Sequence, residues 1–307
     1  MSAVESLSSG VAVLRRAIYA NETVSREDLA GLLRRSDDSP ELARLVADVA
    51  TDLLVRQADP PRYVSQADAD WFAGELRASP VAYAAKIGAL LDVLHYAISA
   101  PPSLEEYCVG EIEEAIVQGR HGHVKGLVTP QDTQALRQAV FAAVEGSALH
   151  VTRASAEALF RIAHAAKDLD NDPAFDDFFA KAVGNYLMGI AFHWNPTAAE
   201  AREKKDWLDE KPQGFGAFLG SMLSGFGEAD FRSLDEVEEA IDARENEADA
   251  REMAIAGEID PAETLWLVAH LSRPGELTSA EKALLRFLKQ EAPSLPAPLC
   301  GRLGEAA

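Results

Sequence analysis

The stretch from Asp132 to Met188 contains the pattern that decides the fold of this chain. It reads QALRQAVF (134–141), a loop, VTRASAEALFRI (151–162), an acidic turn, and PAFDDFFAKAVGNYLM (173–188). In each segment, apolar residues recur at the three- and four-residue spacing of a helix that buries one face. A shorter version lies near the N-terminus, as AVLRRAIY (12–19), VSREDLAGLLRR (24–35) and PELARLVADVATDLL (40–54). This repetition predicts an internal duplication of helical units.

The two copies agree at the positions expected to form the core. The spacings of apolar residues after Pro40 and Pro173 are identical, and only the loops between segments differ in length. The matching pairs include Leu14 and Leu136, Leu32 and Leu159, Leu42 and Phe175, Leu45 and Phe178, Val46 and Phe179, and Leu54 and Leu187. Weaker copies of the central unit begin at Val64 and Leu277, so the units start at Val24, Val64, Val151 and Leu277. In each unit an apolar residue precedes a Ser or Thr that begins a capped helix.

The absence of sustained period-two alternation predicts an all-α fold, with at most a short β bridge between paired loops. The glycine-punctuated segment GRHGHVKG (119–126) is the expected boundary between a first half, 1–126, and a second half, 127–307. An insertion at about 194–260 interrupts the second half.

Composition limits the partners that this chain is expected to bind. Its net charge is −21, from 50 acidic and 29 basic residues. Such a surface repels nucleic-acid phosphates, so no nucleic-acid partner is expected, whereas a basic partner would suit it.

The sequence also indicates the cellular compartment in which the protein is expected. No apolar run reaches the roughly 18 residues of a membrane span, and the N-terminus lacks the pattern of a signal peptide. Cys108 and Cys300 are too few and too distant for a disulfide framework. We therefore expect reduced thiols in a cytoplasmic protein without a membrane span.

The order of helix, loop with one apolar residue, Ser or Thr, and acid-capped helix resembles the outline of an EF-hand pair. It also resembles the helical TerB-like family associated with tellurite resistance. Calcium in an EF-hand needs oxygen ligands at alternate loop positions. The first three such positions hold Ala17, Tyr19 and Asn21 before Val24, and Val144, Gly146 and Ala148 before Val151. The resemblance therefore implies EF-hand-like helix pairs that have lost their ion ligands and kept their packing.

Asp168, Asp170 and Asp172 are the best candidates for metal ligands, because carboxylates at alternate positions suit a hard cation. However, Pro173 stands where an EF-hand loop needs glycine, and Phe179 stands where it needs glutamate. The alternative interpretation is an acidic start to the helix that begins at Pro173, which the helix dipole favours.

His121 and His123 form a second candidate, since two nearby histidines can share a metal ion. They lie in the glycine-rich connector, and we interpret them as part of a solvated loop.

The uncharged segment GFGAFLGSMLSGFG (214–227) is unusual in this chain. It reads as a close-packed core helix, as an exposed apolar patch that binds a partner, or as a segment that enters a membrane interface. Its glycine spacing matches neither a P-loop nor a dinucleotide fingerprint. We predict that the partner-contact surface consists of Trp194, Trp207, Phe215, Phe218 and Phe226.

The sequence contains no nucleophile elbow, HExxH or CxxC motif, so no catalytic residue and no cofactor is predicted. The leading interpretation is a non-enzymatic helical module that binds a protein partner through the apolar insertion. The second interpretation is a sensor or enzyme that depends on calcium, magnesium or manganese bound by the acidic cluster at 168–177. A third interpretation, separate from these two, is homo-oligomeric assembly through the same insertion.

Overall fold

The computed structural model describes residues 3–20, 23–142, 151–188, 259, 261–271, 276–292 and 296–300. Within these ranges the regular elements are helices, apart from one isolated β bridge, which confirms the all-α fold. The elements are α1 (Ala3–Ile18), α2 (Arg26–Leu33), α3 (Pro40–Thr51), the π-helical turn η1 (Asp52–Arg56), α4 (Gln66–Ala78), α5 (Tyr83–Tyr96), α6 (Pro102–Gln118), α7 (Pro130–Val140), α8 (Arg153–Ala166), α9 (Pro173–Met188), α13 (Pro261–Leu271), α14 (Ser279–Glu291) and α15 (Ala297–Cys300). No helix among them has the length and apolar character to cross a membrane.

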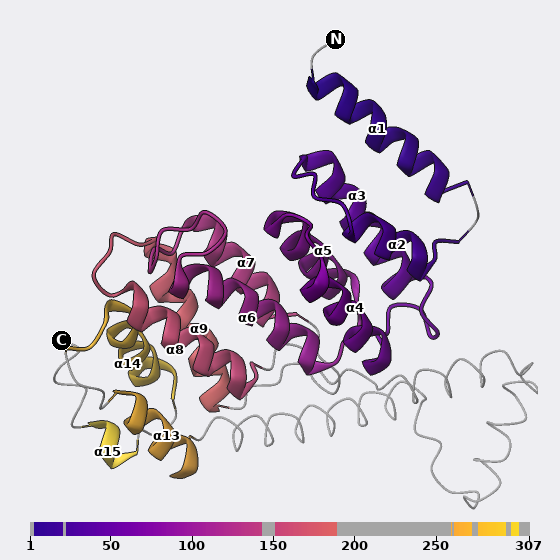
Figure 1. The fold of residues 1–307 in the computed structure, drawn as a ribbon. Coiled ribbons are helices and arrows are strands. Elements are labelled where there is room, and N and C mark those ends of the chain that lie inside the picture. The colour runs from indigo at the N-terminus through magenta and orange to yellow at the C-terminus, as the bar shows by residue number, and fades with distance from the viewer. Residues whose placement is uncertain are drawn as a thin grey trace, which may run out of the picture.

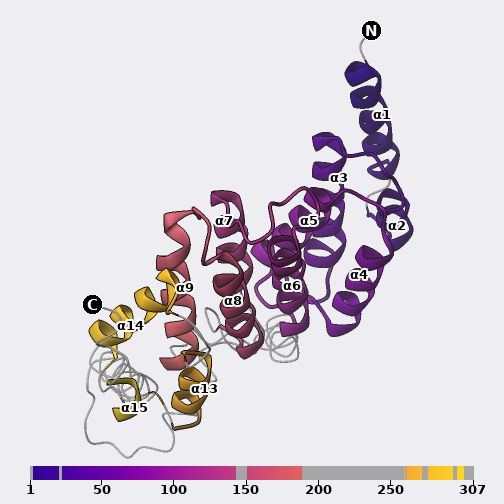
Figure 2. The ribbon, with the colours of Figure 1, turned by 60° about the vertical axis from the view of Figure 1, so that its left-hand side comes forward.

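The helices form a curved stack of two layers (Figures 1 and 2). In one layer α1, α3, α5, α7, α9 and α14 each pack against the next. In the other layer α2 packs against α4, α4 against α6, and α6 against α8. Contacts of α2 with α3, α5 with α6, α6 with α7, and α8 with α9 join the layers. The chain therefore passes from layer to layer as a series of helical hairpins, which is the arrangement of an α-solenoid.

The second layer continues from α8 to α13 through aromatic side chains. The Phe160 ring lies 5.5 Å from Trp266 and is stacked at 4.4 Å on His270. The indole nitrogen of Trp266 also donates to the carboxylate of Glu157 at 3.3 Å. These contacts place α13 beside α8, so that α13 and α14 extend the two layers.

A single hydrophobic core runs through the described parts of both predicted halves, from Val11 to Leu299. The helix before the expected boundary, α6, packs against α7 and α8, which follow it. The Gln138 amide of α7 donates to the carbonyl oxygen of Leu91 in α5 at 3.2 Å. The two halves predicted from the sequence therefore share one core.

The helix caps predicted for the units are present. Ser25, Ser65, Thr152 and Thr278 each accept a hydrogen bond from the backbone N–H three residues later. The apolar residue before each cap is buried at Val24, Val64 and Val151 and half-buried at Leu277. Each cap satisfies one N–H group that the first helical turn leaves without a backbone partner.

The loops before these caps are held by different groups in different units. The Val64 N–H donates to the Ser99 carbonyl oxygen at 2.9 Å, beside the parallel bridge between Tyr63 and Ser99. The Val151 N–H donates to Oδ1 of Asn185 in α9 at 3.0 Å. None of these contacts joins one predicted unit loop to another, and the EF-hand-like and TerB-like origin of the units stays a prediction.

The unit that begins at Leu277 differs from the other units in the layer that its helix occupies. Its helix, α14, packs against α9 in the same layer as α3 and α5, whereas α2, α4 and α8 lie in the opposite layer. The sequence match between the units at Val64 and Leu277 therefore does not correspond to equivalent places in the stack.

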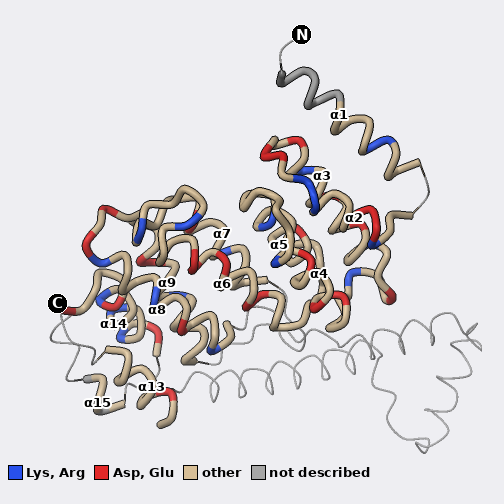
Figure 3. The backbone as a smooth tube through the Cα atoms, viewed as in Figure 1, with Lys and Arg blue, Asp and Glu red and all other residues tan. Residues whose placement is uncertain are grey.

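Surface charges are distributed over both layers, with acidic positions along the described stack and basic positions among them (Figure 3). Some of the arginines pair across neighbouring helices, including Arg26 with Asp68 at 2.6 Å. Such exposed pairs contribute little individually to stability. Each pair neutralises one carboxylate. A carboxylate that has no such partner among the described residues is therefore a candidate for binding a ligand.

Candidate functional site

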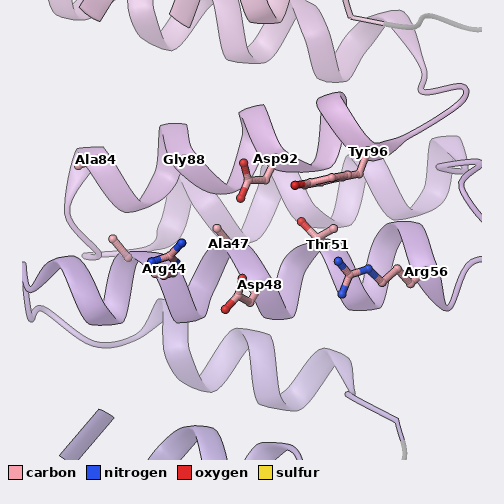
Figure 4. Close-up of a pocket in the computed structure, with 10 residues that line it drawn as sticks. Arg44, Ala47, Asp48, Thr51, Arg56, Ala84, Gly88, Asp92 and Tyr96 are labelled. Atoms are coloured by element: carbon pink, nitrogen blue, oxygen red, sulfur yellow. The ribbon is translucent and has the colours of Figure 1, made fainter. Parts of the chain in front are cut away.

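A cavity of about 330 Å³ lies between α3, η1 and α5 (Figure 4). Helix α5 lines it with Ala84, Gly88, Asp92 and Tyr96, and helix α3 lines it with Ala43, Ala47 and Thr51. Both rows follow the four-residue spacing that places side chains on one helical stripe. We call this cavity, together with Arg44, Asp48 and Arg56 at its edges, the α3–α5 groove.

The two helices run in the same direction along the groove (Figure 4). The small side chains Ala43, Ala47, Ala84 and Gly88 therefore gather at one end. Space exists there because helices packed through such residues have little side-chain volume between them. Polar side chains from both helices meet at the other end.

Two of the charged groups at the groove are already paired. The Asp48 carboxylate accepts from the guanidinium of Arg15 in α1 at 2.5 Å. The Arg56 guanidinium donates to Asp52 at 2.5 Å. By contrast, neither Arg44 nor Asp92 takes part in any of the ion pairs or side-chain hydrogen bonds found in the described residues.

Asp92 is half-buried, and Figure 4 shows its carboxylate directed toward α3. Burial raises the pKa of Asp92 above its ordinary value, and the nearby Asp48 carboxylate raises it further. His95 and Arg44 act in the opposite direction. The carboxylate is therefore partly desolvated without a cation in contact, which a positively charged ligand would remedy.

Thr51 supplies a second group without a partner. The residue is only 3% exposed, and its Oγ1 has no hydrogen-bond partner in the described part of the chain. Figure 4 shows this hydroxyl directed toward α5, near Asp92 and Tyr96. A buried hydroxyl left unsatisfied costs about 1–3 kcal/mol, so a ligand that bonds to it recovers part of that free energy.

The backbone at the polar end of the groove is irregular. The Gln57 N–H donates to the Asp52 carbonyl oxygen at 2.9 Å, which closes the wide π-helical turn η1. Such turns occur frequently at functional sites. The loop that follows is tied to α5, because Nε of Arg62 donates to the Tyr96 carbonyl oxygen at 3.0 Å.

The three aspartates predicted as metal ligands lie in the turn before α9. Asp168 and Asp170 are exposed, whereas Asp172 accepts from the Ala174 N–H at 3.2 Å. That contact is the one expected if the acidic turn serves to begin the helix. In the described residues no group of three or more His, Cys, Asp or Glu side chains is arranged to hold a metal ion.

The interpretation of the connector as a solvated loop is wrong for His123. Its imidazole is 17% exposed, with Nε2 at 3.0 Å from Oδ1 of the buried Asp132. Its Nδ1 lies 3.0 Å from the Arg120 carbonyl oxygen. His121 stacks on Tyr83 with ring centres 4.7 Å apart. The connector packs on the protein because these contacts hold both histidines.

The predicted partner-contact residues lie outside the described residues. They are Trp194, Trp207, Phe215, Phe218 and Phe226.

The groove residues were missed in the sequence, although two signals pointed to them. Asp92 is the one acidic residue between Glu75 and Glu105, within an otherwise largely apolar helical segment. Small residues also recur at four-residue spacing in both groove helices. Neither signal alone indicates that the two stripes face each other.

No family model, no curated protein and no solved structure matches this chain.

Proposed function

We propose that this chain is a non-enzymatic helical scaffold that binds a segment of a partner protein, with the α3–α5 groove as one of its contact sites. The observation that carries this proposal is the presence in one cavity of Asp92, Arg44 and the buried Thr51 hydroxyl, none of which has a partner within the described part of the chain. Groups of both charges beside a buried hydroxyl favour a ligand with both donors and acceptors, and a peptide segment has both.

The architecture supports the same function. Stacked helical hairpins present extended surfaces, and proteins of this kind use them to bind other proteins. Helices in one layer run side by side, so a groove between neighbours lies open along its length. The α3–α5 groove is such a groove, with a floor of small side chains.

The apolar insertion forms the second part of the proposal. Trp194, Trp207, Phe215, Phe218 and Phe226 concentrate apolar area in a chain of net charge −21. Aromatic residues are enriched at the buried centres of protein interfaces. A partner that touches both regions would bind more tightly than either region alone allows.

A capture experiment with paired glycine variants tests the groove. Gly88 lines the groove and Gly74 lies in α4, and an added Cβ at either position meets no described atom within 4 Å. We expect the wild-type chain and Gly74→Phe to retain the same partner from a lysate of the source cells. Gly88→Phe should lose that partner, because its ring fills the groove. Equal capture by all three chains would contradict a role for the groove.

The same experiment with a chain that lacks residues 205–227 tests the insertion. Loss of the partner with an unchanged circular dichroism spectrum would support its role. Full retention would remove the insertion from the proposal.

A further inference from the structure

We infer that the α3–α5 groove receives a lysine or arginine side chain from a basic segment of the partner protein. This inference rests on the proposed function and specifies the chemistry of the partner. It names Asp92 as the group that pairs with the cation, Thr51 as a second acceptor and Arg44 as the group that binds an acceptor on the same segment.

The carboxylates around the groove differ in whether a side chain of the protein already pairs with them. Asp48 is held by Arg15 at 2.5 Å. Asp52 is held by both the Tyr19 hydroxyl and Arg56, each at 2.5 Å. Asp92 is the groove carboxylate that remains without a contact of this kind among the described residues. A cation that enters the groove therefore meets one free carboxylate, and a charge-assisted hydrogen bond to it is stronger than a neutral one.

The polar end of the groove offers acceptors in addition to Asp92. An ammonium or guanidinium group carries several N–H donors, which one carboxylate does not satisfy alone. Thr51 is only 3% exposed and lines the same cavity, and its Oγ1 is buried with no hydrogen-bond partner among the described residues. The Tyr96 ring extends along the groove toward Asp92 (Figure 4), where its face and hydroxyl are available to a cation.

The groove also has room for the rest of a basic residue. The small side chains of Ala47 and Gly88 leave room for an unbranched methylene stem, which packs on apolar surface while its charged end stays at the polar end. Arg44 lies at the edge and pairs with no carboxylate of the described residues, so it disfavours a second cation and favours a carbonyl or carboxylate. A basic residue within a peptide meets both conditions, because its own backbone supplies the carbonyl groups.

The overall charge is consistent with this choice. A chain of net charge −21 attracts basic segments at long range, which raises the rate of encounter without determining where they bind. Asp92 would repel an anion at the polar end of the groove, whereas Arg44 at the edge would attract one. The test must therefore separate binding at Asp92 from general attraction to an acidic surface.

Fluorescence anisotropy with the full chain makes that separation. The probes are two fluorescein-labelled hexapeptide pools with the same randomised flanks, one with lysine or arginine at the third position and one with norleucine there. We expect the basic pool to bind more tightly. Asp92→Asn should weaken its binding by roughly tenfold or more, and Thr51→Val by severalfold. Glu75→Gln, on half-buried Glu75 of α4, removes the same charge outside the groove and should leave binding unchanged.

Equal losses in Asp92→Asn and Glu75→Gln would overturn the inference, as would equal binding of the two pools. Thermal melting checks that each variant is folded. If Asp92→Asn does not fold, the binding of the basic pool to Thr51→Val is the test, and unchanged binding would overturn the inference. If Gly88→Phe abolishes capture of a partner but Asp92→Asn does not, the groove binds a protein and the inference about its chemistry fails. If Gly88→Phe leaves capture of the partner unchanged, the proposed function of the groove is wrong.

Discussion

Gly184 and Gly88 are both glycines inside helices of the same layer, yet their surroundings differ. A Cβ on Gly184 would lie 2.4 Å from Cε1 of Phe287 in α14, whereas a Cβ on Gly88 would meet no described atom within 4 Å. Gly184→Ala should therefore lower the free energy of unfolding by about 1–3 kcal/mol, because the Phe287 ring must move. Gly88→Ala should raise it by up to about 1 kcal/mol, because alanine favours the helix. Urea titration of both variants measures the change in the free energy of unfolding, and a change in the same direction for both would contradict this account.

The sequence did not distinguish these two glycines. Each stands within an apolar helical pattern, and the local spacing is compatible with either role. The difference arises from Phe287, which follows the insertion and lies far from Gly184 along the chain. Asp92 is a similar case, since its surroundings depend on how α3 and α5 face each other. Features that depend on distant packing were missed at the scale of single residues.

Capped helices are the elements that the sequence predicted best, because a cap and its N–H partner are three residues apart. Ser25 accepts from the Asp28 N–H at 3.2 Å and Ser65 from the Asp68 N–H at 3.1 Å. Ser25→Ala and Ser65→Ala should each lower the free energy of unfolding by about 1 kcal/mol. Ser36→Ala, at an exposed serine between α2 and α3, serves as the control and should change it by less than about 0.5 kcal/mol. Urea titration checks these values, and cap variants that match the control would refute the capping role.

The placement of whole elements was harder to predict. Helices α5 and α6 have the apolar spacing of a helix in the sequence, at Ile87, Leu90 and Leu94 and at Val109, Ile112 and Ile116. The layer of α14 was not expected, because it depends on where the chain returns after the insertion. The packed state of the connector was also missed, since it requires that Asp132 in α7 and Tyr83 in α5 lie beside the histidines. Local pattern predicts a helix, but the register between helices decides what it touches.

For the molecule as a whole, Glu105 connects the two predicted halves. It lies in α6, is 1% exposed, and accepts hydrogen bonds from the Ser155 and Thr152 hydroxyls of the second half. Burial raises the pKa of Glu105 from its ordinary 4.5 to about 7, although the hydrogen bond from Ser155 acts in the opposite direction. The folded protein therefore holds a proton here at pH values where the unfolded chain has released it.

The pH dependence of stability follows from that difference. The contribution of Glu105 is fully present below pH 4.5 and is lost as the pH rises through about 7. Glu105→Gln keeps the shape and cannot ionise. Between pH 5 and 8 the wild type should lose on the order of 3 kcal/mol of unfolding free energy relative to this variant. Urea titrations at several pH values measure the difference, and parallel curves for the two proteins would show that Glu105 does not titrate in this range.

The contact between α9 and α14 has a consequence for how the chain folds. Most helices of the stack touch elements that are close in sequence, so their contacts close short loops at small entropic cost. Hairpins from α2 to α9 can therefore form one after another as the polypeptide leaves the ribosome. The face of α9 around Gly184 is different, because α14 is synthesised only after residues 189–278 have been added. Until then α14 cannot cover that face, so the time taken to translate the insertion delays this contact in the nascent chain.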